Sequence, residues 1–106
     1  MNKADAHDQD ICPVARVAGL VGDPCTLLIV RDLLEGTKRF KDLESSLSPI
    51  SSRTITNKLK ALEEMKFITR THFKERPPRV EYALTKEGKK LNGLIKEMRT
   101  YGQKYL

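Results

Sequence analysis

Four polar side chains recur at helical spacing near the middle of the chain, at Arg53, Thr56, Asn57 and Lys60. Positions i, i+3, i+4 and i+7 share one face of an α-helix. An arginine guanidinium can donate two hydrogen bonds to guanine O6 and N7, and an asparagine amide can pair with the edge of adenine. This face therefore has the chemistry needed to read base pairs.

Hydroxyl and ammonium groups extend the same segment. Short hydroxyls that suit phosphates or base edges gather in its first turn, at Ser51, Ser52, Thr54 and Thr56. The N-terminus of a helix itself favours a phosphate. Lys58 and Lys60 lie further along the helix, where we expect them to contact phosphates.

Two further basic clusters flank this segment. The first holds Lys38, Arg39 and Lys41, and the second holds Lys74, Arg76 and Arg79. Contacts to phosphates position a protein without reading sequence, and an arginine can also enter a narrow minor groove. Three clusters placed where one docking mode needs them favour nucleic acid. The alternative for any single charge is a solvated side chain, which we prefer for Lys86, Lys89, Lys90 and Lys96.

The composition is compatible with this interpretation. The chain has 106 residues, which suits one domain, and 20 Lys and Arg against 14 Asp and Glu give a net charge of +6. Such an excess suits a polyanionic partner. His7 and His72 lie far apart, and neither they nor the cysteines have the spacing of zinc ligands. No nucleophile motif or phosphate loop is present, so we expect no enzyme, no metal and no cofactor.

Residues 1–10 are polar and lack the apolar centre of a signal peptide, so we expect a disordered tail. No run approaches the roughly 18 apolar residues of a membrane span. We expect a cytoplasmic protein with no membrane partner.

Four helices are predicted before residue 66. A helix over 13–21 begins with Pro13, and a second begins at Pro24, after Asp23 as N-cap, and stops at Gly36. We expect a third from Thr37 to about Ser48. The fourth follows a cap at Ser51 or Ser52 and runs to about Met65, with its core stripe at Ile55, Leu59 and Leu62.

Two strands, over 68–73 and 80–84, surround a turn stiffened by Pro77 and Pro78. Thr85 then caps a long final helix. Two helices joined by a short turn and followed by a hairpin predict a winged helix–turn–helix, mainly α within the α+β class. It has extra N- and C-terminal helices and forms a single domain over residues 11–106.

The terminal helices carry more apolar surface than one small domain can cover. We assign a dimer interface to the residues Val14, Val17, Leu94, Ile95, Met98, Tyr101 and Tyr105. Regulators with this motif commonly bind DNA as symmetric dimers.

Cys12 lies at or beside the N-cap of the first helix, where a helix N-terminus stabilises a thiolate and suits it to sensing oxidants. The alternative is a small apolar residue in a dimer seam. Cys25, inside the second helix, is interpreted as buried filler, and a Cys12–Cys25 bridge stays open.

The chain resembles the HxlR-type winged-helix regulators, relatives of the MarR group, over about residues 11–106. The matching stretches are C-P-V at 12–14, R-F-K-D-L at 39–43, I-S-S-R-T-I-T-N-K-L-K-A-L-E at 50–63 and P-P-R-V-E-Y-A-L-T-K-E-G at 77–88. The resemblance implies a homodimer built from the first and last helices, with each protomer reading half of a pseudo-palindromic site. It also implies a redox role for a cysteine at the position of Cys12 in some members. One departure is Gly22-Asp23-Pro24-Cys25, where such proteins usually have Gly-Gly-Lys-Trp, so Cys25 replaces a large aromatic residue.

We interpret the chain as a sequence-specific regulator of transcription that binds double-stranded DNA as a homodimer. We expect repression, with redox control through Cys12 and any small-molecule effector unknown. Two other functions stay open. One is a winged helix that binds proteins, and the other is a non-specific binder of nucleic acid.

Overall fold

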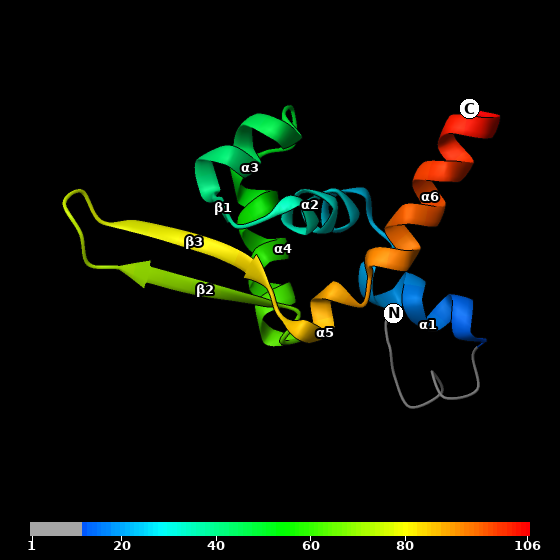
Figure 1. The fold of residues 1–106 in the computed structure, drawn as a ribbon, viewed down its shortest axis with the longest axis horizontal. Helices are drawn as coiled ribbons and strands as arrows, with labels where there is room; N and C mark the ends of the chain where they lie inside the picture. Colours follow the sequence, from blue (N-terminus) through cyan, green and yellow to red (C-terminus); the bar gives the residue numbers. More distant parts are fainter. Residues whose placement is uncertain (1–11) are drawn as a thin grey trace.

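The computed structural model describes residues 12–106 (Figure 1), so the expected tail lies outside the described residues. The elements, in chain order, are α1 (Pro13–Val21), α2 (Pro24–Glu35), β1 (Lys38–Arg39), α3 (Phe40–Leu47), α4 (Ser52–Glu64), β2 (Ile68–Phe73), β3 (Arg79–Leu84), α5 (Lys86–Lys89) and α6 (Asn92–Tyr105). This order confirms the winged helix–turn–helix fold, with helices added at both ends.

Local capping defines the first two helices, as predicted. The Asp23 carboxylate accepts a hydrogen bond from the Thr26 backbone N–H at 2.9 Å, and Pro24 follows as the first helical residue. Gly22 ends α1 against the backbone of Ala18, so closely that a Cβ there would collide with the Ala18 carbonyl oxygen. The chain can therefore turn from α1 into α2 within two residues.

The hydrophobic core lies where α2, α3 and α4 meet. Its fully buried side chains include Ile29 from α2, Leu43 from α3, and Ile55 and Leu62 from α4. Burial of each such side chain contributes about 1.5–3 kcal/mol. The core stripe predicted for the fourth helix is confirmed, and this packing fixes the direction of α4 relative to the rest of the molecule.

A three-stranded antiparallel sheet has the order β1-β3-β2. The prediction of a third helix from Thr37 is wrong at its start, because Lys38 and Arg39 form β1 and pair with Tyr82 and Glu81 of β3. Helix α3 begins only at Phe40. The Asp42 carboxylate accepts a hydrogen bond from the Arg39 backbone N–H at 2.9 Å and so caps this later start.

The prediction of one long helix after Thr85 is also wrong. Thr85 caps only the short α5, through a 3.1 Å hydrogen bond from the Gly88 N–H to its hydroxyl. Gly88 packs against the Phe67 carbonyl, where no Cβ would fit. The amides of Lys90 and Leu91 donate to carbonyls three residues back, and these tight turns end α5 before α6 begins. The hairpin of β2, β3 and the loop between them is the wing, and in Figure 1 α6 projects from the body on the side away from it.

Within residues 12–106, no single helix is long and apolar enough to cross a membrane. Helices α1 and α2 reach the required length and composition only as a pair bent by 83°.

Candidate nucleic-acid interface

The N-terminal turn of α4 is fixed by side-chain hydrogen bonds. The Ser51 hydroxyl accepts from the Thr54 N–H at 3.1 Å and donates to the Thr54 hydroxyl at 3.0 Å. The Ser52 hydroxyl donates to the Glu44 carboxylate on α3. These predicted DNA contacts thus also hold the start of the helix in place and join it to α3.

The face that begins at Arg53 is open to solvent. Arg53, Asn57 and Lys60 are exposed, and Thr56 between them is half-buried. None of the three exposed side chains has a hydrogen bond or ion pair with another side chain among residues 12–106. Three donors are therefore available along one helix face for an external acceptor.

Lys58 lies apart from that face and connects two helices. Its Nζ is 3.6 Å from Asp23 Oδ1, at the N-terminus of α2. Burial alone would raise the pKa of Asp23, but hydrogen bonds from Thr26 and the charge of Lys58 bring this pKa below its usual 3.8. The Lys58 charge is thus engaged within the protein, unlike those of Arg53 and Lys60.

The residues of the first basic cluster differ in how exposed they are. Lys38 is half-buried and pairs with Glu35 at 3.2 Å, whereas Arg39 and Lys41 are exposed. Two of the three predicted phosphate contacts therefore have side chains open to a ligand.

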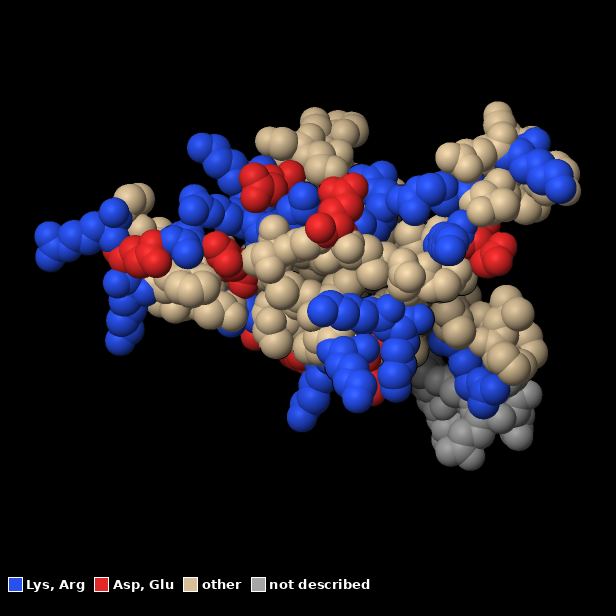
Figure 2. Space-filling view, viewed as in Figure 1, with Lys and Arg blue, Asp and Glu red and all other residues tan. Residues whose placement is uncertain are grey.

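The wing divides its basic residues in a similar way. Lys74 and Arg76 are exposed in the loop between β2 and β3. Figure 2 shows basic side chains projecting from the wing end, with acidic ones directly behind them. Figure 2 also shows a separate basic group over α5, where Lys86, Lys89 and Lys90 are exposed.

Arg79 is held within the wing. Its guanidinium lies 4.4 Å from the centre of the Phe73 ring, donates to Glu81 Oε2 at 2.8 Å and pairs with Glu75. The hydrogen bond to Glu81 is the main reason that the pKa of Arg79 is raised above its usual value. Through these contacts Arg79 holds the two strands and the loop of the hairpin together.

A polar groove separates α4 from the sheet. It has a volume of about 380 Å³ and is lined by Thr56, Leu59, Lys60, Glu63, Arg70 and Tyr82. Arg70 and Tyr82 are not among the residues that the sequence pattern indicates. The alternation of side chains along a strand could have indicated Arg70. Ile68 is buried, and a residue two positions further along a strand lies on the same face of the sheet.

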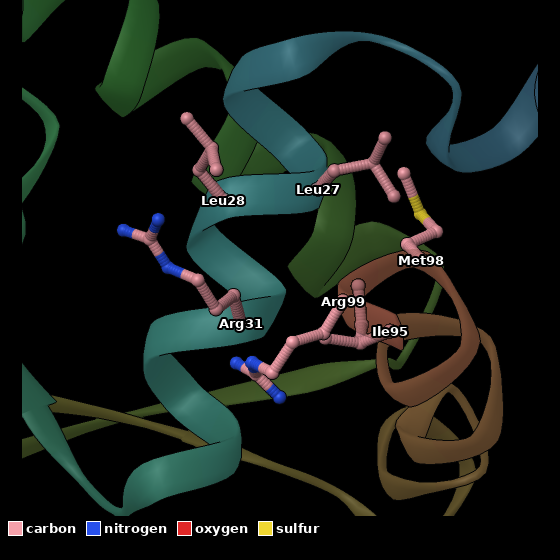
Figure 3. Close-up of a pocket in the computed structure, with 6 residues that line it drawn as sticks. All are labelled: Leu27, Leu28, Arg31, Ile95, Met98 and Arg99. Atoms are coloured by element: carbon pink, nitrogen blue, oxygen red, sulfur yellow. The ribbon is translucent and has the colours of Figure 1, made fainter. Parts of the chain in front are cut away.

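A second groove, of about 220 Å³, separates α2 from α6 (Figure 3). Its walls are Leu27 and Leu28 on α2 with Ile95 and Met98 on α6, and Arg31 and Arg99 complete the lining. The Arg31 guanidinium turns away from it and donates to Asp32 at 3.0 Å and Ser46 at 3.2 Å. Below the groove, Ile95 packs in the core together with Leu27 and Leu28, and this packing attaches α6 to the rest of the molecule.

Sequence comparison identifies the family to which this arrangement belongs. The model of the HxlR-like helix-turn-helix family matches residues 20–106. The protein belongs to the HxlR-like helix-turn-helix family. It is 34% identical over 100 residues to the HTH-type transcriptional regulator YdeP of Bacillus subtilis (strain 168), covering 94% of this chain and 78% of YdeP.

Solved structures agree with the family. A transcriptional regulator of the MarR family from Porphyromonas gingivalis W83 has a TM-score of 0.85 and 29% identity, and all of both chains is covered. The redox regulator HypR, in its oxidized form, has a TM-score of 0.84 and 27% identity, covering 90% of this chain and 98% of HypR. This HxlR-like protein is therefore a DNA-binding transcriptional regulator with a MarR-like winged helix, in a family of regulators.

Both cysteines of the HxlR-like protein are free thiols. Cys12 is exposed, and its Sγ accepts a hydrogen bond from the Ala15 N–H at 3.5 Å as the cap of α1. Cys25 is buried in the core, where burial raises the pKa of its thiol. The residue in the position usually held by tryptophan thus serves as a small core residue.

Most of the assigned interface residues in the two terminal helices are exposed. Val14 is 76% exposed and Tyr101 is 59% exposed, and Val17, Leu20, Met98 and Tyr105 are exposed as well. Ile95 differs, because it is buried in the core of its own chain, and Leu94 is half-buried. Leu20 and Leu106 are also exposed apolar residues, and the sequence pattern does not indicate either of them.

Proposed function

We propose that this regulator binds a specific, pseudo-palindromic operator as a homodimer and represses transcription. The observation that carries the proposal is the exposed α4 face of Arg53, Asn57 and Lys60, whose donors are unused by side chains among residues 12–106. A well-capped helix holds these donors in line, which base recognition in the major groove requires.

A gel-shift titration at several salt concentrations tests this function against its two alternatives. Specific binding predicts a large difference in affinity between operator and random DNA, together with a steep salt dependence. Non-specific binding would give the salt dependence without the difference. A failure to bind DNA at low salt would instead support a winged helix that binds proteins.

The exposed apolar surface of α1 and α6 supports the homodimer. An isolated domain gains nothing from large apolar side chains in water, and pairing two copies of this surface would remove them from it. Symmetric pairing also matches a two-fold operator, because each protomer then presents one α4 to one half-site.

Repression follows from occupancy. A dimer that covers an operator obstructs the polymerase without any further contact, and the proposed place of this action is the cytoplasm, where the DNA target lies. Deletion of the gene is expected to raise expression from a reporter placed behind the operator. A fall in expression would identify an activator instead.

Redox control through Cys12 is the proposed signal. The thiol is exposed at the N-terminus of α1, next to the proposed dimer surface, and HypR provides a relative described as a redox regulator. Diamide is expected to change operator affinity in the wild type and to have no effect on Cys12→Ser. Operator binding that diamide leaves unchanged in both proteins would exclude this signal.

A further inference from the structure

The polar groove between α4 and the wing has a place in any complex of this fold with DNA. A helix in the major groove and a hairpin directed at the neighbouring minor groove lie on either side of one sugar–phosphate strand. The space between them must receive that strand. In this protein the space is the groove lined by Lys60 of α4 and by Arg70 and Tyr82 of the sheet.

The groove brings cations together from two elements. Lys60 and Arg70 are both exposed, and neither has an ion-pair partner within the described part of the chain, residues 12–106. Three other cations near the interface are engaged, since Lys38, Lys58 and Arg79 pair with acidic residues. The two groove cations therefore remain available to an anion.

The register of the sheet sets the position of the second wall. Arg70 of β2 lies directly opposite Tyr82 of β3, so both side chains are on the same sheet face. Tyr82 is half-buried and packs against the core. Its hydroxyl adds a neutral donor to the groove that Arg70 also lines, and a fixed strand pair positions both residues.

The acidic residue in the groove limits where an anion can lie. Thr56, Lys60 and Glu63 follow one another at i, i+4 and i+7, so Glu63 occupies the end nearest the C-terminus of α4. An anion is repelled from that end. It is favoured toward Thr56, the end nearest the bases that α4 is proposed to read.

We propose that this groove binds one backbone phosphate in each half-site, through Lys60, Arg70 and Tyr82. This inference rests on the proposed function and adds a positioning site to it. A phosphate fixed here sets how far α4 enters the major groove without reading sequence.

The test compares Arg70→Gln and Tyr82→Phe with Lys96→Gln, which removes an exposed charge from α6, on the side of the molecule away from the wing. Affinity is measured over a range of salt on a duplex selected from random DNA and on a scrambled duplex. Arg70→Gln is expected to weaken binding about tenfold on both duplexes and to reduce the salt slope by about one. Tyr82→Phe is expected to weaken binding about threefold, and Lys96→Gln to match the wild type.

A second measurement replaces single phosphates of the selected duplex by uncharged methylphosphonates. One position per half-site is expected to weaken the wild type strongly and Arg70→Gln less, because this variant has already lost one of the three groups that hold that phosphate. The phosphate site is overturned if Arg70→Gln is as sensitive as the wild type to methylphosphonates at every position. It is also overturned if the affinity of Arg70→Gln equals that of Lys96→Gln. If the wild type prefers the selected duplex, such a result leaves the proposed function intact, whereas a wild type that binds neither duplex overturns both.

Discussion

Arg53 lies in the first turn of α4, with its guanidinium exposed and without an ion pair among residues 12–106. If it donates two hydrogen bonds to a guanine, Arg53→Ala should cost about 1–3 kcal/mol of operator affinity and relax the preference at one base pair. Affinities for the operator, its single-base variants and random DNA measure this loss. Equal losses on operator and random DNA would argue against base reading by Arg53.

Asp23 gives the protein a dependence on pH that does not involve DNA. Its lowered pKa means that the charged form stabilises the fold above the usual value of 3.8 and that this stability disappears as the pH falls through the lower folded pKa. The Lys58 pair is more than one-third exposed, so we expect under about 1 kcal/mol.

The variant Asp23→Asn isolates this charge, because asparagine also caps helices well. Urea unfolding of the two proteins should differ above about pH 5, with the wild type more stable, and the difference should close below pH 3.8. A difference that persists unchanged at pH 3 would show that the charge of Asp23 is not its cause.

At the scale of elements, the wing depends on Arg79 for rigidity. The guanidinium connects Glu75 in the loop with Phe73 and Glu81 on the two strands. Arg79→Gln should therefore speed amide hydrogen exchange at the outer ends of β2 and β3 about fivefold. Arg76→Gln is the matched control, since it removes an exposed loop charge and should leave exchange unaltered. Equal exchange in both variants would show that Arg79 does not brace the wing.

Helices whose start and core face are set by their own residues and their immediate neighbours in the chain could be predicted from the sequence. An N-cap aspartate, a proline and an apolar stripe define α2 locally, and an N-cap serine and an apolar stripe define α4. Strand β1 has no such local signal, because Lys38 becomes a strand only by pairing with Tyr82, far along the chain. The break between α5 and α6 also has no local signal, because the tight turns at Lys90 and Leu91 include no proline and the N-cap of α6 is a leucine.

The candidate site also has one part that local sequence predicts and another part that depends on the folded structure. The spacing of Arg53, Asn57 and Lys60 places them on one face in any helix. Whether a basic residue is available to bind DNA depends on its neighbours in space. Lys58 of α4, for example, pairs with Asp23 at the N-terminus of α2. Arg70 enters the interface only once the sheet is placed beside α4.

At the scale of the whole molecule, the exposed apolar surface of α1 and α6 predicts a dimer. Light scattering at micromolar concentration should give the mass of two chains for the wild type and of one chain for Tyr101→Glu, because a charge would be buried in the seam. Gln103→Glu adds the same charge outside the apolar stripe and should stay dimeric. A monomeric wild type would contradict the dimer directly.

Affinity for the operator should depend on whether the protein is a dimer. Two linked half-site contacts reinforce one another, so a monomeric Tyr101→Glu is expected to lose at least about 100-fold in operator affinity. Gln103→Glu is expected to bind as the wild type does. An unchanged affinity in a monomeric variant would show that one protomer suffices for recognition.

The central claim is that two copies of α4 read a specific two-fold site, and selection of bound sequences from random DNA tests it most directly. The enriched sequences should contain an inverted repeat whose half-site centres lie about one helical turn, or a multiple of it, apart. Arg53→Ala should lose its preference at one base pair in each half. An unenriched pool, or a single half-site without its repeat, would contradict the account.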